Sequence, residues 1–317
     1  RAVVMRCTAT NATPADDNGH GTRVASVLAA NTDNWSYGAG VDRHCRIMPV
    51  KVLDASNSGA YSQWAQGVNW AVSNGAKVIS LSAGGTGWNN SLHNAITNAI
   101  AYGAIFVTVT HNFPAMGILF PGSDPVSITV GGTQTNNVRC PFSAYGTNID
   151  LVAPATNIYT ITTGSVWGIW GGTSYAAPQV AGTAALICSI RPELNSEQVR
   201  NLLCAGADDQ AGSDTNDVAG FDSYYGWGRL NVYNSLVLAG TEFDSIARTT
   251  NGDIVLSWVC PPNASNKLPY KLDYAADLLT NGWISVSNIT YQSTLASWQE
   301  SLTNAVNRFY RVRVRRP

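Results

Sequence analysis

The chain has 317 residues, of which 45% are hydrophobic and 12% are charged, and its formal net charge is −1. This size allows one large hydrophobic core and a smaller second one, so one or two domains are expected. The sequence has no basic patch and no block of like charges, which argues against a nucleic-acid-binding protein and against a disordered tail. No apolar run approaches the length of a membrane span. Low charge with 29 Gly, 10 Trp and many neutral polar residues is typical of a secreted protein.

Six cysteines are scattered along the chain and are too far apart for a zinc site, which needs close pairs. They are Cys7, Cys45, Cys140, Cys188, Cys204 and Cys260. Their even number permits disulfides, and buried thiols are equally consistent with the spacing. Cys188 and Cys204 lie in consecutive predicted helices and are the first pair to test as a disulfide. The chain starts with Arg1 and shows no signal peptide, which indicates a processed or truncated product and says nothing against secretion.

In chain order, predicted strands alternate with predicted helices over the first two thirds of the sequence. Short apolar runs rich in β-branched residues predict strands at 46–53, 77–84, 105–110 and 127–133. Between them, apolar residues recur at helical spacing in 61–74 and 91–103. Strands separated by helices of this length pair in parallel, so the pattern predicts a doubly wound α/β sheet flanked by helices. Active sites in such sheets gather at the carboxyl ends of the strands.

The pattern changes after residue 240. Short runs of alternating apolar and polar residues follow, with no helix of comparable length between them, which predicts a small all-β sandwich of fibronectin-like or immunoglobulin-like size. We therefore expect two domains, 1–240 and 241–317. The aromatic residues of the second domain are interpreted as sandwich core rather than as a sugar-binding face: Trp258, Trp283, Trp298, Tyr270, Tyr274, Tyr291, Phe309 and Tyr310.

Three motifs contain residues suited to acyl transfer. Ser174, in "GGTSYAAPQVAG", stands at the start of a predicted helix, after glycines that allow a tight turn and leave the hydroxyl open to substrate. His20, in "NGHGTRVASV", also begins a helix, whose positive end would disfavour the imidazolium and keep the ring able to accept a proton. Asn112 follows the strand 105–110, where its amide could face a developing oxyanion. Each residue alone is more often a helix cap or a turn residue.

Taken together and in this order, the motifs resemble those of the subtilases, the subtilisin-like serine proteases, over about residues 1–240. This resemblance implies a subtilisin-like fold and a serine endopeptidase that acts on protein or peptide substrates. It implies that Ser174 is the nucleophile, that His20 is the general base, and that Asn112 lies in the oxyanion hole. It also implies that a substrate peptide pairs with the backbone of Ser82, Ala83 and Gly84, and that Gly59 lies on the opposite wall.

The orienting aspartate of the family comes at the end of a strand some thirty or more residues before the histidine. Asp16 and Asp17 are the only acids before His20, and they are too close in sequence to end a separate core strand. We therefore expect the triad aspartate upstream of Arg1 and absent from this chain. Its loss lowers turnover of a serine protease by roughly 10⁴, so weak or no activity is expected of this chain.

Other positions depart from the family pattern. Arg23 replaces a histidine that many subtilases carry, and a small effect on the chemistry is expected. His44, His93 and His111 have no partner motif and are interpreted as surface or packing residues. Calcium sites are frequent in the family, but no run of acids has a spacing that assigns one. No cofactor is therefore predicted, and a propeptide inhibitor is an expected further partner.

Two other functions remain open from the sequence. The first is a non-catalytic subtilase-like scaffold that binds peptides, although His20, Asn112 and Ser174 are all present. The second is an adhesion or carbohydrate-binding protein led by residues 241–317. Whether this C-terminal part binds a surface or stabilises the protease domain is not decided by its sequence. An extracellular location is expected under each interpretation.

Overall fold

A computed structural model describes residues 2–4, 15–35, 38–240 and seven strands between residues 243 and 314. The chain forms two compact units, Arg1–Val232 and Tyr233–Pro317. The expected boundary after Gly240 differs from this division, because the helix α6 (Val232–Ala239) falls mainly in the second unit.

The first unit is built on a parallel five-stranded sheet in the order β1-β2-β3-β4-β5. The strands are β1 (Ala2–Val4), β2 (Val78–Leu81), β3 (Ile105–Val109), β4 (Ile128–Thr133) and β5 (Leu151–Pro154). Every residue of β2, β3 and β4 is buried, which accounts for their continuous runs of apolar and β-branched residues. The predicted parallel α/β sheet is thus confirmed, including three of the four predicted strands.

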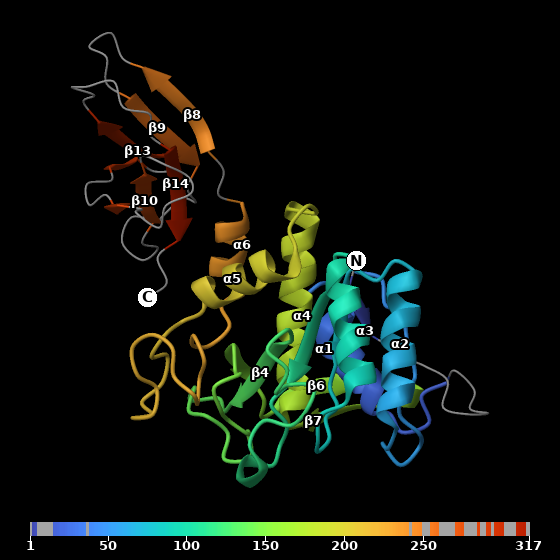
Figure 1. The fold of residues 1–317 in the computed structure, drawn as a ribbon. Coiled ribbons are helices and arrows are strands. Elements are labelled where there is room, and N and C mark those ends of the chain that lie inside the picture. Colours follow the sequence, from blue (N-terminus) through green and yellow to red (C-terminus); the bar gives the residue numbers. More distant parts are fainter. Residues whose placement is uncertain are drawn as a thin grey trace. The chain divides into compact units, whose positions relative to one another are not determined.

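Helices cover the sheet (Figure 1). The helix α1 (His20–Ala29) packs against α4 (Thr173–Ile190), and α4 contacts all five strands, whereas α2 (Tyr61–Ser73) packs against α3 (Asn90–Ala101). The helix α5 (Ser196–Gly206) packs against α4. A hairpin of β6 (Ile158–Ile161) and β7 (Trp167–Trp170) lies beside α1, and single 3-10 turns occur at Pro114–Met116 and Thr163–Ser165.

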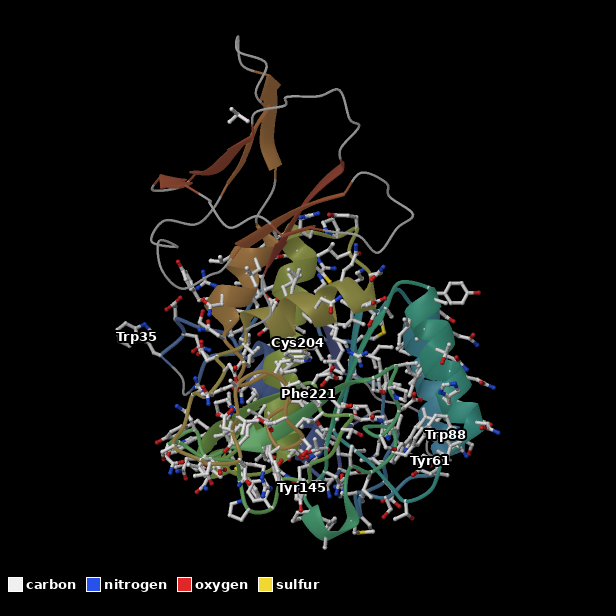
Figure 2. All side chains as sticks on the ribbon, turned by 60° about the vertical axis from the view of Figure 1, so that its left-hand side comes forward. Trp35, Tyr61, Trp88, Tyr145, Cys204 and Phe221 are labelled. Carbon is white, nitrogen blue, oxygen red and sulfur yellow. The ribbon has the colours of Figure 1, made fainter. Side chains whose placement is uncertain are left out.

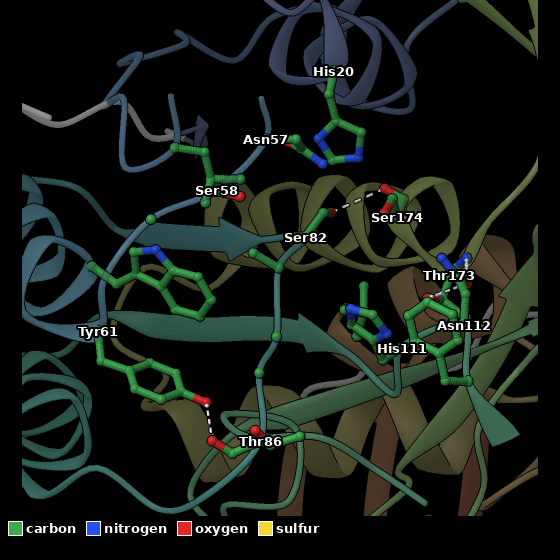
Figure 3. Close-up of a pocket in the computed structure, with 18 of the residues that line it drawn as sticks. His20, Asn57, Ser58, Tyr61, Ser82, Thr86, His111, Asn112, Thr173 and Ser174 are labelled. Atoms are coloured by element: carbon green, nitrogen blue, oxygen red, sulfur yellow. Dashed lines mark hydrogen bonds between the residues drawn. The ribbon is translucent and has the colours of Figure 1, made fainter. Parts of the chain in front are cut away.

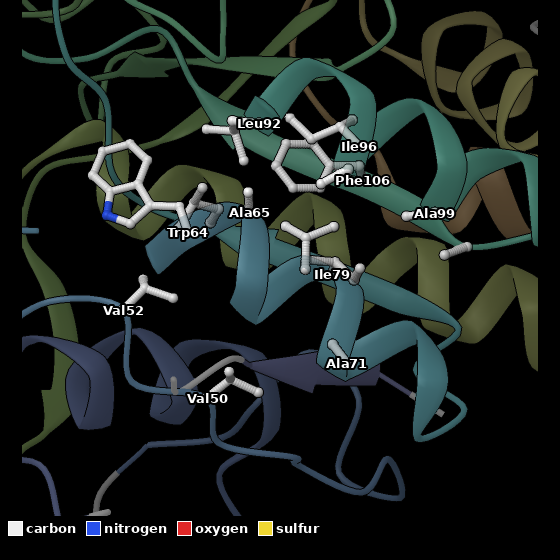
Figure 4. Packing of buried hydrophobic residues seen from close by; sticks show 14 of the residues in the cluster. Val50, Val52, Trp64, Ala65, Ala71, Ile79, Leu92, Ile96, Ala99 and Phe106 are labelled. Carbon is white, nitrogen blue, oxygen red and sulfur yellow. The ribbon is translucent and has the colours of Figure 1, made fainter. Parts of the chain in front are cut away.

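A hydrophobic cluster joins α2 and α3 to the sheet (Figure 4). Ile79 of β2 and Phe106 of β3 pack there against the apolar faces of the two helices, which contribute Trp64, Ala65, Ala71, Leu92, Ile96 and Ala99. The predicted helices at 61–74 and 91–103 are therefore correct in position and in buried face. This cluster fixes β2 and β3, whose carboxyl ends carry candidate site residues.

The predicted strand at 46–53 is wrong. Among the described residues no strand pairs with this segment, and the structure assigns it no strand of its own. Val50 and Val52 are nevertheless buried in the cluster with α2, which explains their apolar character. A strand requires a hydrogen-bonding neighbour as well as an apolar pattern, and Pro49 cannot donate a backbone hydrogen bond.

The described strands of the second unit form two antiparallel sheets. One has the order β11-β10-β14 and the other the order β12-β13-β9-β8. The strands are β8 (Phe243–Arg248), β9 (Ile254–Val259), β10 (Tyr270–Ala275), β11 (Ile284–Ser285), β12 (Thr290–Gln292), β13 (Leu295–Glu300) and β14 (Phe309–Val314). The predicted aromatic core of this unit lies outside the residues whose side chains are described.

Side-chain environments differ widely across the first unit (Figure 2). Trp35 is fully exposed, whereas Cys204 is buried, and its thiol donates to the Asp150 carbonyl at 3.8 Å. Cys188 is a free, buried thiol, so it forms no disulfide with Cys204, the partner that the sequence suggested testing first. Cys7 and Cys260 lie outside the described residues. None of the described helices has the length and apolarity needed to cross a membrane.

Candidate active site

Ser174 occupies the second position of α4. The helix begins after Gly172, whose φ of 142° and ψ of 152° lie in a region that a residue with a Cβ rarely adopts. Five apolar residues of this helix are fully buried: Ala177, Val180, Ala181, Ala184 and Ile187. The helix is thus anchored in the core, and its first turn presents Ser174 at the surface of the sheet layer.

The carbonyl of Ser174 depends on a side-chain donor. Its normal partner in an α-helix would be the N–H of the residue four positions later, but that residue is Pro178, which has no N–H. Instead, the Ser82 hydroxyl donates to the Ser174 carbonyl oxygen at 3.0 Å (Figure 3). Ser82 directly follows β2, so this bond fastens the first turn of α4 to the carboxyl end of the sheet.

Asn112 is oriented by the residue before Ser174. Its Oδ1 atom accepts hydrogen bonds from the backbone N–H of Thr173 at 2.9 Å and from the Thr173 hydroxyl at 3.0 Å. Because a backbone N–H can only donate, the oxygen of the amide must face Thr173 and the NH₂ group must face elsewhere. The Nδ2 atom lies close to Gly172, where a Cβ would come within 3.4 Å of it. The NH₂ group therefore lies beside Gly172, the residue before α4, and points away from Thr173.

His20 is the first residue of α1. The helix begins after Gly19, which has a φ of 87°, and a Cβ at this position would lie 2.4 Å from the Thr162 hydroxyl oxygen. The turn into the helix thus requires glycine. The wall that carries His20 is completed by Asn57 and Ser58, which come from the loop before α2 (Figure 3).

The two aspartates near His20 have other partners. Asp16 accepts hydrogen bonds from the backbone N–H groups of Asn18, Gly19 and Thr22 and from the Thr22 hydroxyl, at 2.6–3.1 Å. Asp17 forms an ion pair with the buried ammonium group of Lys51. Within the described residues, the His20 ring has no hydrogen bond or ion pair to a carboxylate. Neither aspartate replaces an orienting triad carboxylate.

The surroundings of His20 favour its neutral form. Burial and the positive charge of Arg23 lower the pKa of His20 below its usual value, while Asp16 opposes the shift. The Arg23 guanidinium stacks on Trp170 at 4.2 Å and donates to the Tyr175 hydroxyl at 3.2 Å, so its charge is held near the site. A neutral imidazole can accept a proton at neutral pH.

One groove of about 940 Å³ brings all of the predicted site residues together (Figure 3). Its lining includes His20, Asn112, Ser174, Gly59, Ser82, Ala83 and Gly84. These residues come from segments that are far apart in the sequence and that meet at the carboxyl ends of β2 and β3. A serine hydroxyl, a candidate base and an amide donor on one groove are suited to acyl transfer.

The groove has one open stretch of backbone. Pairing of β2 with β3 ends at Leu81, and the next backbone pairing is the bridge between Gly85 and Phe120. Ser82–Gly84 lie between these points, along the groove and outside any strand. This segment is suited to pairing with an extended peptide.

Histidines other than His20 were not assigned to a site by the sequence. His111 was interpreted as a surface or packing residue, and the structure places it on the lining of the groove. His93 bonds through Nδ1 to the fully buried carboxylate of Asp124 at 2.7 Å, which is a packing role. The only sequence signal for His111 was its position directly before Asn112. In the described part of the chain, no group of three or more His, Cys, Asp or Glu side chains is arranged to hold a metal ion.

Comparison with known proteins agrees with this geometry. A sequence model of the Subtilase family matches residues 5–228, which include the whole groove. The chain belongs to the Subtilase family. It is 38% identical to Subtilisin DY of Bacillus licheniformis over 221 residues, which are 68% of this chain and 77% of the relative. Subtilisin Savinase of Lederbergia lenta is 38% identical over 218 residues, with the same shares covered. M-protease of Shouchella clausii is 41% identical over 189 residues, or 59% of this chain and 49% of the relative. This subtilase is a serine endopeptidase.

Proposed function

We propose that this subtilase cleaves peptide bonds through an acyl-enzyme formed on Ser174. His20 accepts the proton of the Ser174 hydroxyl as its oxygen attacks the scissile carbonyl carbon, and the imidazolium then gives that proton to the leaving amine. In the second half, His20 takes a proton from water as the water oxygen attacks the acyl carbon. The bond from that carbon to the Ser174 oxygen then breaks, the imidazolium returns the proton to the Ser174 oxygen, and the acid product leaves. The observation that supports this proposal is the meeting of His20, Asn112 and Ser174 on one groove.

The oxyanion of the tetrahedral intermediate would be bound by two donors. One is the NH₂ group of Asn112, whose orientation follows from the bonds that Thr173 donates to its oxygen. The other is the backbone N–H of Ser174, which lies in the first turn of α4, where N–H groups have no partner within the helix. In a serine protease, removal of one such donor costs about 10²–10³ in turnover.

We propose slow turnover for the chain described here. Among the described residues no carboxylate bonds to the His20 ring, so none of them selects its tautomer, and the loss of such a bond costs a serine protease about 10⁴ in turnover. The groove, His20 and Ser174 remain in place, so the chemistry is weakened rather than abolished.

The remaining parts of the proposal concern binding and location. A substrate peptide would pair with the backbone of Ser82–Gly84 and pass Gly59 on the other wall. Hydrolysis would need no cofactor, although a propeptide could occupy the groove as an inhibitor.

Residues 241–317 would form an accessory β-sandwich, which is supported by two antiparallel sheets in that region. An extracellular location is supported by the low charge and the neutral polar composition.

Labelling with a fluorophosphonate tests the proposal, because the reagent reacts only with an activated serine. We expect slow covalent labelling of the 317-residue chain, complete loss of labelling in Ser174→Ala, and strongly reduced labelling in His20→Ala. Ser189→Ala is the matched control, since Ser189 is an exposed serine on the same helix. Labelling that persists in Ser174→Ala would disprove the assignment of the nucleophile.

A non-catalytic peptide-binding scaffold is the second candidate, and the observation that favours it is that no carboxylate bonds to the His20 ring in the part of the chain that the structure describes. This function requires peptide binding in the groove with no labelling of Ser174. Isothermal titration with an uncleaved peptide, run beside the labelling assay, separates the two functions.

A further inference from the structure

His111 carries a side chain in a backbone conformation that favours glycine. Its φ is 83°, and it lies between the end of β3 and Asn112. Outside glycine, such a conformation is uncommon and is a form of strain that often occurs at functional sites. The imidazole lines the groove between Ser82 and Asn112 (Figure 3).

Two neighbours fix the imidazole ring of His111. The ring stacks on that of Phe113, with 5.1 Å between their centroids and 26° between their planes. Its Cδ2 edge lies against Gly84, where an added Cβ would come within 3.1 Å of Cδ2. The ring is therefore held between the substrate-pairing segment and the loop that follows the oxyanion donor.

The two ring nitrogens of His111 have different surroundings. The Nδ1 atom is buried and has no hydrogen-bond partner. The Nε2 atom is not enclosed in this way and has no hydrogen bond to any described residue, so it is open to the groove. A neutral imidazole carries one proton, and that proton is favoured on the nitrogen that can reach an acceptor. The groove therefore presents Nε2–H as a donor.

Protonation of the second nitrogen is opposed by the site. Burial lowers the pKa of His111, and a proton on Nδ1 would have no acceptor. The other titratable residues that line the groove are His20, Tyr61 and Tyr175, and none of the lining residues is Asp, Glu, Lys or Arg. The donor is thus uncharged and lies in a groove without fixed charge.

Building on the proposed function, we propose that His111 is a specificity-determining residue whose Nε2–H donates to the side-chain amide oxygen of a glutamine or asparagine substrate. This substrate residue would be the one that supplies the scissile carbonyl. In the proposed function Asn112 binds the oxygen of that carbonyl, and His111 directly precedes Asn112 on the same groove, so the side chain of the same substrate residue is the one placed to reach His111. An uncharged donor favours a neutral acceptor over a carboxylate, which would lose its hydration without gaining a cation.

Cleavage of three peptides that differ only in the residue before the scissile bond tests the proposal. Glutamine is compared with methionine, which has a similar shape without the amide, and with glutamate. At pH 8 we expect kcat/KM to be about 3–10 times higher for glutamine than for methionine, the range of one neutral hydrogen bond, and lowest for glutamate. A ratio of one for glutamine and methionine, or a preference for glutamate, would overturn the proposal.

Variants identify the donor. His111→Gly removes the ring and suits the φ of 83°, so the glutamine-to-methionine ratio should fall to about one. The ratio compares kcat/KM for the two peptides on the same variant, so a change that affects the cleavage of both peptides equally does not alter it. His44→Gly is the matched control, because His44 is exposed, bonds to Arg43 and does not line the groove; it should keep the ratio of the parent chain.

Two further readouts separate this proposal from the proposed function. Product peptides that end in glutamine or in methionine can bind in the groove without any bond being cleaved. The peptide that ends in glutamine should bind about 3–10 times more tightly in titration calorimetry. If the fluorophosphonate labels Ser174 and both product peptides bind equally well, the role of His111 is disproved while the proposed hydrolytic function stands. If Ser174 is not labelled but the glutamine product binds more tightly than the methionine product, the hydrolytic function is disproved while the role of His111 stands.

Discussion

At the scale of single residues, Arg23 is a charged neighbour of the candidate base and contributes to the shift of its pKa. We expected a small effect of this residue on the chemistry. The structure holds its guanidinium near His20 by stacking on Trp170 and by a bond to Tyr175. After burial, the charge of Arg23 is the next cause that lowers the pKa of His20.

Arg23→Met should therefore raise the pKa of His20. The acid limb of kcat/KM against pH reports the free enzyme's base, so this limb should move to higher pH, and activity near pH 6 should fall more than activity near pH 8. Arg43→Met is the control, because Arg43 is exposed and pairs with Asp33. An unchanged acid limb in Arg23→Met would show that Arg23 does not act on the charge of His20.

Ser82 has a second role at this scale that its sequence motif did not reveal. Ser82→Ala would leave the Ser174 carbonyl without a donor, because Pro178 has no N–H. We expect a decrease of about 1–2 kcal/mol in the free energy of unfolding, together with slower labelling of Ser174. Urea denaturation measures the first effect.

The control for Ser82→Ala is Ser189→Ala, which removes an exposed serine that bonds within its own helix. In the background of Pro178→Ala, which restores an N–H to the helix, the cost of Ser82→Ala should decrease. An equal cost in both backgrounds would show that the Ser82 hydroxyl does not replace the missing helical donor.

The sequence predicted the residues of the groove better than their contacts. His20, Asn112 and Ser174 could be found because their motifs have specific neighbours. The bond from Ser82 to Ser174 joins residues far apart in the chain, and its only sequence signal was a proline four positions after the serine. His111 could not be placed because the direction of its side chain depends on a left-handed φ and on Phe113 and Gly84, which local patterns do not report.

At the scale of secondary structure, the N-terminus of α1 depends on Asp16. Burial alone would raise the pKa of this carboxyl, but hydrogen bonds from Thr22, Gly19 and Asn18 outweigh it, so the net shift is downward. A group with a lowered pKa contributes stability above its ordinary value of 3.8, and this contribution is lost as the pH falls through the folded-state pKa.

Asp16→Ala should decrease the free energy of unfolding at pH 7 by about 1–2 kcal/mol, the usual range for loss of a helix cap. The difference from the parent chain should shrink below pH 4, where the carboxyl of the parent also becomes protonated. Denaturant titrations at several pH values measure both effects. Asp33→Ala is the control, because the Asp33 side chain is 83% exposed. A difference that persists undiminished at low pH would contradict the role of the charged carboxylate.

Most elements with a regular pattern of buried apolar residues were predictable, although the buried strand β5 was not predicted. The helices α2 and α3 bury apolar residues at regular spacing, and β2 to β4 are buried throughout. The hairpin of β6 and β7 exposes Tyr159, Trp167 and Trp170, so it lacks the alternation that marks a strand. The segment 46–53 shows the reverse case, since its valines are buried without strand pairing.

At the scale of the whole molecule, the groove belongs to the first unit alone. All residues that line it lie before Val232, and the family match ends at residue 228. A chain shortened after Gly240 should therefore remain folded and keep the labelling of Ser174 at the rate of the full chain. Circular dichroism and fluorophosphonate labelling measure these two properties.

A second chain, shortened after Val232, lacks most of α6 and tests the two alternative domain boundaries. If it unfolds while the chain ending at Gly240 does not, α6 is needed for the first unit and the boundary expected from the sequence is correct. Loss of labelling in both shortened chains would instead show that the protease unit depends on the C-terminal strands.

The glycines before the two catalytic candidates have a consequence for evolution. Gly19 and Gly172 both have positive φ values, and each precedes a helix that presents one reactive side chain. Their loss would disturb the backbone whether or not the protein is an enzyme. A descendant that no longer cleaves peptides could therefore exchange its histidine or serine while it still retains both glycines. The glycines thus indicate shared ancestry and fold, and only the residues that follow them indicate catalysis.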